Sequence, residues 1–263
     1  MKNKIKTLWE DGTPIINSWM SSNSPFCAEV LAESGYDSIT VDLQHGLNDY
    51  KDALTIFQAI GRYPVCPMVR VPWLDPQIIM KTLDAGSMGV ICPMINTSKQ
   101  AEEFVSYMRY PPLGQRSYGP TRAIYSAGDS YWEHANTEIL ALAMIETKES
   151  FENIKSIVNT KGLSGIYIGP SDLSIGLSDG QLKPGMDRAE PEILSAIQSI
   201  LNEAKMAKIF AGIHCATAEY AAKAISWGFN MVTVHSDVRL LGEVATQTVN
   251  STREFIGKVY HDE

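Results

Sequence analysis

Short apolar runs alternate with segments of helical periodicity along the whole chain. Segments with apolar residues three and four positions apart follow most of the runs, at 25–33, 49–60, 75–86, 98–108, 150–158, 191–207 and 238–256. The runs themselves have the length and continuous apolar character of buried strands, at 14–20, 38–42, 65–71, 88–94, 140–145, 165–168, 209–213 and 231–234. This pattern predicts eight parallel strands, each followed by a helix.

Helix-capping residues support several of these boundaries. Ser24 and Pro25 are typical of a helix start, and Asp49 can cap the helix that follows it. Asp75 and Pro76 open the next helix in the same way, and Gly86 suits the left-handed residue that ends one. The predicted helices therefore begin and end where the chain carries the matching polar or glycine residue.

Two segments depart from the alternation. Residues 109–136 are rich in Pro, Gly, Tyr and Arg and show no sustained periodicity, which predicts a loop too long for a simple connection. Residues 176–185 form a shorter, glycine-rich excursion. Long loops of this kind usually form a lid or an interface.

Eight strand–helix units favour a closed (β/α)8 barrel, a single α/β domain over residues 1–263. An open, doubly wound sheet is the alternative, but no GxGxxG follows the first strand. In a barrel the working groups lie at the carboxyl ends of the strands. The mouth would then receive Trp19, Asp42, His45, Arg70, Glu146, Asp172, His214 and His235.

Two of these residues, Glu146 and Asp172, each follow an apolar strand, and the helical segment 150–158 lies between them. A crossover helix returns the chain to the starting side of the sheet, so both carboxylates leave the same edge. The unit predicts two acids converging on one spot. A carboxylate at a strand end can also be a helix cap or an ion-pair partner, and His45 can be a packing histidine.

Composition narrows the function classes. The 263 residues carry a net charge of −8 with no basic run, which argues against a nucleic-acid surface or an anionic membrane. The chain shows neither a membrane-spanning apolar segment nor a signal-peptide core, so we expect a cytoplasmic protein. Four singly spaced cysteines, Cys27, Cys66, Cys92 and Cys215, are expected to be reduced core residues.

Six motifs, found in order along the chain, carry a family resemblance: VDLQHG, PMVRVPWLDP, LDAGSMGVICPMINT, RYPPLGQRSYGPTRA, IET and IGPSDLS. The chain resembles the HpcH/HpaI family of class II, metal-dependent pyruvate aldolases. The resemblance implies a (β/α)8 barrel that reversibly cleaves a 4-hydroxy-2-oxoacid to pyruvate, or hydroxypyruvate, and an aldehyde. It also implies a divalent metal ion, Mg²⁺, Mn²⁺ or Co²⁺, held by Glu146 and Asp172.

The resemblance further implies a role for each remaining site residue. His45 would act on the proton of the substrate 4-hydroxyl, with Asp84 supporting the histidine and Asp42 the next candidate for that support. Arg70 would stabilise the enolate that cleavage leaves, because that charge needs a hard cation or a guanidinium. The other expected substrate contacts come from Gly169, Ser171, Asp172 and Trp19, whereas His214 and His235 are expected to be wall residues.

Two positions depart from the common family pattern. Met144 stands where many members have a glutamine two residues before the metal glutamate, and Gln44 stands where an acid often precedes the histidine. Gln44 also occurs in relatives such as macrophomate synthase. We interpret it as a mark of a family branch rather than a loss of function.

The sequence leaves three other functions open. A lysine Schiff-base aldolase needs a lysine at the mouth, but no predicted strand ends in one. An oxaloacetate decarboxylase or carbon–carbon bond-forming synthase, resembling macrophomate synthase, would keep the metal and the enolate. The last is a catalytically silent oxoacid-binding protein.

The last predicted helix suggests an assembly. Its apolar positions within 238–256 suit a helix that packs by one face, at Leu240, Leu241, Val244, Ala245, Val249, Phe255 and Ile256. In the family that the chain resembles, terminal helices are exchanged between subunits of a hexamer. We therefore expect a homo-hexamer, a trimer of dimers, with residues 109–136 near an interface.

Overall fold

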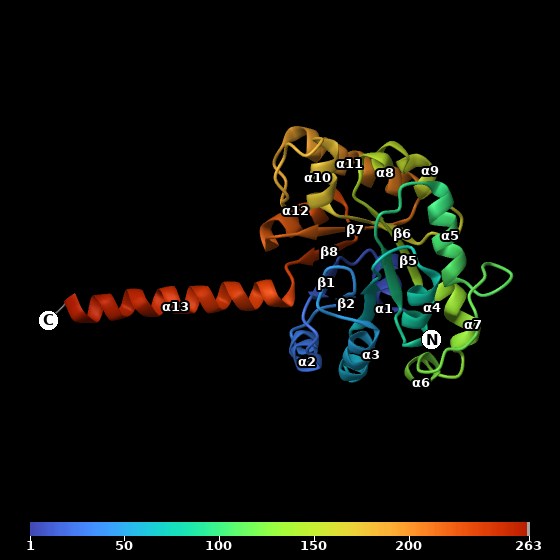
Figure 1. The fold of residues 1–263 in the computed structure, drawn as a ribbon, viewed down its shortest axis with the longest axis horizontal. Helices are drawn as coiled ribbons and strands as arrows, with labels where there is room; N and C mark the ends of the chain where they lie inside the picture. The colour runs from blue at the N-terminus through green and yellow to red at the C-terminus, as the bar shows by residue number, and fades with distance from the viewer. Residues whose placement is uncertain (262–263) are drawn as a thin grey trace.

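The fold is a closed barrel of parallel strands surrounded by helices (Figure 1). The computed structural model describes residues 1–261, with side chains through residue 257, so the last residues of the predicted domain lie outside it. In the described chain eight strands pair in sequence order, and β8 returns to β1 with Asn17 opposite Thr233. This closure confirms the barrel and shows that the doubly wound alternative was wrong.

Four observed strands have the predicted bounds, and every strand end of the other four lies within two residues of the prediction. The runs 14–20, 65–71 and 88–94 are longer than the strands inside them, because the flanking residues already turn toward the helices, whereas the strand at 210–215 extends two residues beyond its run. The strands are β1 Ile15–Met20, β2 Ser38–Asp42, β3 Cys66–Arg70, β4 Gly89–Cys92, β5 Leu140–Ile145, β6 Gly165–Ile168, β7 Phe210–Cys215 and β8 Met231–Val234.

The helices confirm most of the predicted segments, with several differences. Helices α1 and α10 were not predicted, and α12 was expected after the seventh strand without predicted bounds. The predicted loop 109–136 contains α6 and most of α7, and the segment 150–158 is divided at Asn153 into α8 and α9. The helices are α1 Lys4–Glu10, α2 Pro25–Glu33, α3 Tyr50–Ala59, η1 Ile60–Arg62, α4 Pro76–Asp84, α5 Ser98–Met108, α6 Ala123–Ala127, α7 Tyr131–Glu138, α8 Lys148–Glu152, α9 Ile154–Val158, α10 Pro170–Leu177, α11 Pro191–Met206, α12 Ala218–Trp227 and α13 Asp237–His261.

The predicted capping residues fill their roles. Ser24 Oγ accepts a hydrogen bond from the Cys27 amide, and Asp49 forms a reciprocal capping box with Asp52. Gly86 follows α4 with φ of +107°, a conformation that L side chains rarely adopt. Local sequence therefore determines where these helices begin and end.

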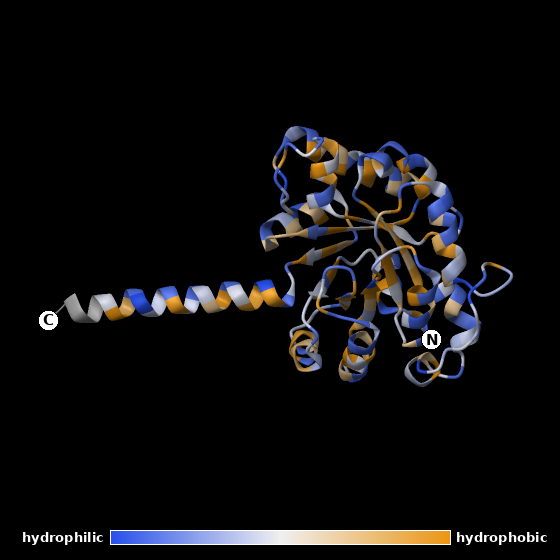
Figure 2. Cartoon of the chain, viewed as in Figure 1, coloured by the Kyte–Doolittle hydropathy of each residue, from blue (hydrophilic) through white to orange (hydrophobic). Residues whose placement is uncertain are grey.

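Two hydrophobic clusters hold the barrel together. The larger one fills the layer between strands and helices, and in Figure 2 the strands and the inward faces of the helices are correspondingly hydrophobic. The smaller cluster fills the barrel interior with large side chains, including Met68, Leu142, Tyr167, Phe210 and Met231. The interior is thus a packed core rather than a channel, so a substrate can enter only at a strand end.

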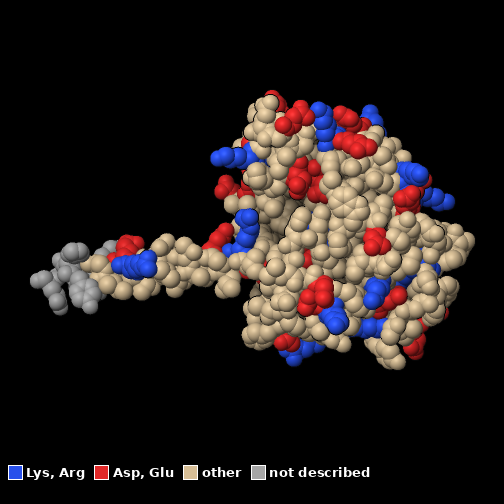
Figure 3. Space-filling model, viewed as in Figure 1, with Lys and Arg blue, Asp and Glu red and all other residues tan. Residues whose placement is uncertain are grey.

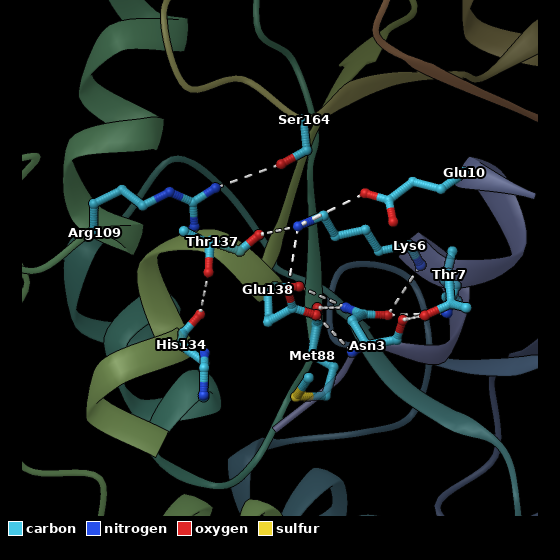
Figure 4. Close-up of polar contacts among 11 residues, drawn as sticks. Asn3, Lys6, Thr7, Glu10, Met88, Arg109, His134, Thr137, Glu138 and Ser164 are labelled. Atoms are coloured by element: carbon cyan, nitrogen blue, oxygen red, sulfur yellow. Dashed lines mark hydrogen bonds and ion pairs between the residues drawn. The ribbon is translucent and has the colours of Figure 1, made fainter. Parts of the chain in front are cut away.

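Helix α1 closes the end of the barrel opposite the carboxyl ends of the strands. The side-chain amide of Asn3, fully buried, donates to the backbone oxygens of Met88 and Glu138 at 2.8 Å each, and Lys6 pairs with Glu138 at 3.2 Å (Figure 4). Ile5, Leu8 and Trp9 pack on the interior cluster. The three-and-four spacing of these apolar residues was the available signal for this helix.

The cysteine prediction holds for three of the four residues. Cys66, Cys92 and Cys215 are buried and unpaired, and burial raises the pKa of the Cys66 thiol to about 12. Cys27 is exposed, so its assignment to the core was wrong. It lies on the outer face of α2 beside Phe26, whose side chain is 72% exposed, so the helix presents an apolar patch to solvent.

Helix α13 extends away from the barrel rather than packing along it (Figure 1). Its apolar residues stay largely exposed, with Leu241 at 70% and Val244 at 61%. Charged side chains of both signs are interspersed over the visible face of the barrel (Figure 3). Among the described helices, none is long and apolar enough to cross a membrane.

Gly165→Ala tests the tight contact between β6 and β7. A Cβ at Gly165 would lie 2.5 Å from the backbone oxygen of Phe210, so the two strands would have to separate. We expect a loss of about 2–3 kcal/mol in the free energy of unfolding, measured by urea denaturation.

Gly242→Ala is the matched control. A Cβ there meets nothing within 4 Å on α13, and alanine is the better helix former by about 1 kcal/mol. Equal unfolding midpoints for the two variants would contradict the close β6–β7 contact.

Candidate active site

A cavity of 440 Å³ opens at the carboxyl ends of the strands. It brings together most of the predicted site residues: Trp19, His45, Arg70, Gly169, Ser171 and Asp172. Asp42, Met144, Met186, His214, His235 and Arg239 also line it. The described lining contains no lysine, which disfavours a Schiff-base aldolase.

Glu146 lies below this cavity at the end of β5, only 3% exposed. Its Oε1 accepts a hydrogen bond of 2.8 Å from the Met94 amide, and Met94 has the left-handed φ of +56°. Burial raises the pKa of Glu146 to about 7, the Met94 amide opposes this shift, and the charge of Asp172 adds to it. The loop after β4 thus binds a buried carboxylate that lies close enough to Asp172 for the two charges to interact.

Asp172 approaches Glu146 from β6. Gly169 and Pro170 turn the chain into α10, so Ser171 and Asp172 occupy the first turn of that helix, where backbone amides have no helical partner. A Cβ on Gly169 would lie 3.0 Å from Glu146 Oε2 and 2.5 Å from Met144 Cε. Only glycine leaves room for the acid beside these amides.

The guanidinium of Arg70 lies at the end of β3, held by Asp42 from β2. Its Nε donates to Asp42 Oδ1 at 2.8 Å and its Nη2 donates to Oδ2 at 2.6 Å. Trp19 donates to the same carboxylate at 3.1 Å, and the Arg70 Cζ lies 4.8 Å from the centre of its ring. Burial would raise the pKa of Asp42, but Arg70, Trp19 and the Gln44 amide together offset it, so the pKa is lowered.

His45 is exposed at the rim of the same cavity. Its backbone amide donates to Asp42 Oδ1 at 3.3 Å, so the Asp42 carboxylate also shapes the turn that carries the histidine. The described chain provides no hydrogen-bond partner for the imidazole. His45 is therefore free to meet a ligand in the cavity.

Asp84 is the predicted site residue that the structure places away from the mouth of the barrel. It ends α4, a helix of nine residues and about 13 Å that runs from the mouth toward the opposite end of the barrel. There Asp84 Oδ1 accepts a hydrogen bond of 2.7 Å from Arg116, a buried residue of the 109–136 segment. Within one chain the expected support of His45 by Asp84 is thus not formed, because a returning helix carries its last residue away from the mouth.

Two residues of the cavity make contacts that the sequence did not predict. Asp42 was only an alternative partner for His45, yet it binds Arg70 and Trp19 and shapes the turn to His45. His214, expected to be a wall residue, lines the cavity and has one ring nitrogen bonded to the protein. The position of both at strand ends was the available signal.

Comparison with known proteins agrees with this geometry. Residues 16–243 match the HpcH/HpaI aldolase/citrate lyase family. The chain belongs to this family. The hydroxypyruvate/pyruvate aldolase of Rhizorhabdus wittichii is 36% identical to it over 95% of the chain and 99% of the relative. The 4-hydroxy-2-oxo-heptane-1,7-dioate aldolase of Shigella sonnei is 33% identical over 93% of each.

Structural comparison extends the match to the fold. An HpcH/HpaI aldolase/citrate lyase family protein from Burkholderia cenocepacia superposes with a TM-score of 0.88 at 28% identity, over 96% of this chain and all of the other. The barrel and its surrounding helices are therefore those of the family.

Asp42→Ala tests the buried ion pair. Arg70 is only 8% exposed, so removing Asp42 leaves a guanidinium without a counter-charge, and we expect a loss of about 3–5 kcal/mol in the free energy of unfolding. Lys155→Ala is the control, since Lys155 is 80% exposed and 3.9 Å from Glu203, and its loss should cost less than about 1 kcal/mol. Similar chemical-denaturation midpoints for the two variants would argue against the importance of the buried pair.

Proposed function

We propose that this protein is a divalent-metal-dependent aldolase that reversibly cleaves a 4-hydroxy-2-oxoacid to pyruvate, or hydroxypyruvate, and an aldehyde. The observation that carries the proposal is the pair of carboxylates Glu146 and Asp172, which are close enough for their charges to interact, with Asp172 beside free helix amides in the cavity that Arg70 also lines. The relatives named as aldolases support the aldol reaction over the decarboxylase or synthase alternative.

The donor set fits a divalent ion, and the family is metal-dependent. Two carboxylates offer the hard oxygen ligands that Mg²⁺, Mn²⁺ and Co²⁺ accept, and no described lysine or arginine forms an ion pair with either acid. No group of three or more metal-binding side chains is present among the described residues, so substrate and water would complete the coordination. When bound, the ion supplies positive charge that stabilises the enolate.

The chain itself provides the remaining groups. The backbone amides of Ser171 and Asp172, at the start of α10, can hold the substrate carboxylate. Asp42 fixes the Arg70 guanidinium before the substrate arrives, so little reorganisation is needed when charge develops on the oxo oxygen. Trp19 forms the wall behind that guanidinium.

Proton transfer is assigned to His45. An exposed imidazole at the rim can remove the proton of the substrate 4-hydroxyl as the carbon–carbon bond breaks, and can return it in the aldol direction. Asp84 of the same chain lies too far along α4 to assist, so its predicted role would require a second subunit. Met144 gives the cavity an apolar thioether at the position where, by the family resemblance, many members have a glutamine.

Glu146→Ala should remove metal binding and with it all enolate chemistry, because one carboxylate alone is a weak divalent site. Calorimetric titration with Mn²⁺ measures the binding, and EDTA should abolish turnover of the unaltered enzyme. Glu149→Ala, an exposed glutamate three residues further on in α8, is the control and should bind Mn²⁺ normally. Normal metal-dependent activity of Glu146→Ala would show that the metal centre is misplaced.

His45→Ala should retain the metal and the enolate but lose cleavage. We expect Mn²⁺ affinity and exchange of the pyruvate C3 protons to persist, while retro-aldol turnover falls by roughly 10²- to 10⁴-fold. Proton exchange is followed by NMR in D₂O and cleavage by release of pyruvate. If exchange and cleavage fell together, His45 would act on the enolate rather than on the 4-hydroxyl.

The assembly is proposed to be a homo-hexamer of cytoplasmic subunits that exchange α13. Exposed apolar faces on α13, at Leu241 and Val244, and on α2, at Phe26 and Val30, support burial between copies.

Light scattering should give about six times the chain mass of 29.0 kDa. The double variant Leu241→Lys, Val244→Lys should dissociate the assembly. The control is Gln247→Lys, which adds a charge at an exposed polar position of the same helix and should leave the assembly intact. A fully active monomer would rule out the exchanged helix.

A further inference from the structure

His214 lies at the end of β7 with one ring nitrogen bound by the protein and the other open to the cavity. Its Nδ1 is 3.2 Å from the Tyr167 hydroxyl, and its ring meets the Trp19 ring edge-on with centroids 5.0 Å apart. Among the described residues Nε2 has no hydrogen-bond partner, and it is not a buried unsatisfied atom. That nitrogen therefore faces the space where the substrate is expected.

A network of buried hydrogen bonds inside the barrel fixes the orientation of the His214 imidazole. The Tyr167 hydroxyl donates to Thr233 Oγ1 at 2.7 Å, and Thr233 Oγ1 also accepts from the Asn17 side-chain amide at 2.9 Å. Ser38 and Thr40 complete the chain by donating to Asn17 Oδ1 at 2.7 and 2.9 Å. A polar network inside an otherwise apolar barrel holds the ring in one orientation.

The imidazole is neutral. Burial, with the nearby charge of Arg70, lowers the pKa of His214 to about 3. A neutral ring has one nitrogen that donates and one that accepts, and a hydroxyl group can pair with either. A methyl group can pair with neither. The open nitrogen thus distinguishes a hydroxylated carbon from an unsubstituted one.

The position of His214 relates it to one carbon of the substrate. Arg70 lies over the Trp19 ring and His214 makes a T-shaped contact with the same ring, so both groups stand beside one tryptophan. Both also line the cavity, so an oxoacid whose C2 oxygen contacts Arg70 can present a substituent on C3 to His214. Of the two β7 residues that line the cavity, His214 and Cys215, the histidine is the one that offers an open ring nitrogen.

We propose that His214 determines specificity by forming a hydrogen bond to a hydroxyl on C3 of the oxoacid, so that the enzyme favours hydroxypyruvate over pyruvate. The inference rests on the proposed aldolase function and adds to it the class of nucleophile.

His214→Phe tests the proposal, because phenylalanine keeps the aromatic contact with Trp19 and removes the nitrogens. The measurement is kcat/KM for hydroxypyruvate divided by kcat/KM for pyruvate, with one aldehyde and Mg²⁺. We expect the ratio to fall about tenfold, the effect of one lost hydrogen bond to a buried partner. The ratio of the two dissociation constants, measured by calorimetry on the Mg²⁺-loaded enzyme, should shift in the same direction.

Three further variants complete the design. His214→Gln restores a polar nitrogen, so its ratio of the two kcat/KM values should lie between those of the unaltered enzyme and His214→Phe. His214→Leu removes the nitrogens as His214→Phe does, but without an aromatic ring. His235→Asn, which changes another histidine of the cavity rim, should leave the ratio unchanged.

An unchanged ratio in folded His214→Phe and His214→Leu would overturn the proposal. Equal losses with both nucleophiles would also overturn it, because they would place His214 at the 4-hydroxyl instead. Failure of the aldolase function itself looks different, since the unaltered enzyme would then exchange C3 protons of neither oxoacid with any of the three metals.

Discussion

The organisation of the cavity depends on one buried ion pair, Asp42 with Arg70. Two hydrogen bonds between a carboxylate and a guanidinium fix both groups in a plane, and the same carboxylate binds the Trp19 ring nitrogen and the amide of His45. Strands β1, β2 and β3 are therefore joined at their carboxyl ends by one acid. A guanidinium held this way presents its positive charge to the cavity without having to move.

The acids on the opposite strands are positioned by different means. Glu146 is held by the amide of Met94, a residue in a left-handed conformation, and it has space because Gly169 lacks a side chain. Neither device can be recognised from the strand pattern, since both depend on residues from other strands. What the pattern does contain is the position of each acid after an apolar strand, and that was sufficient to predict that they would converge.

The contrast between local patterns and contacts distant in sequence also explains how much of the fold and of the site could be predicted. Strand order, most helices and the caps at Ser24 and Asp49 follow from local periodicity and side-chain chemistry, and they were confirmed. The short helices α6 and α7 lack a long apolar face. Their segment is held by contacts distant in sequence, such as the Arg116–Asp84 pair. The sequence pattern therefore predicted a loop there. Asp84 was assigned to the site by resemblance alone, and the direction of α4 places it at the other end of the barrel.

The contacts of helix α1 bear on how the barrel is made. Asn3 bonds to Glu138, 135 residues later in the chain, so α1 can dock only after a segment distant in sequence has folded into place. Until then the apolar side of the helix, with Ile5 and Trp9, has no core to cover. The docking of α1 therefore depends on contacts between residues far apart in sequence, and the entropy of closing so long a loop slows the formation of such contacts during folding.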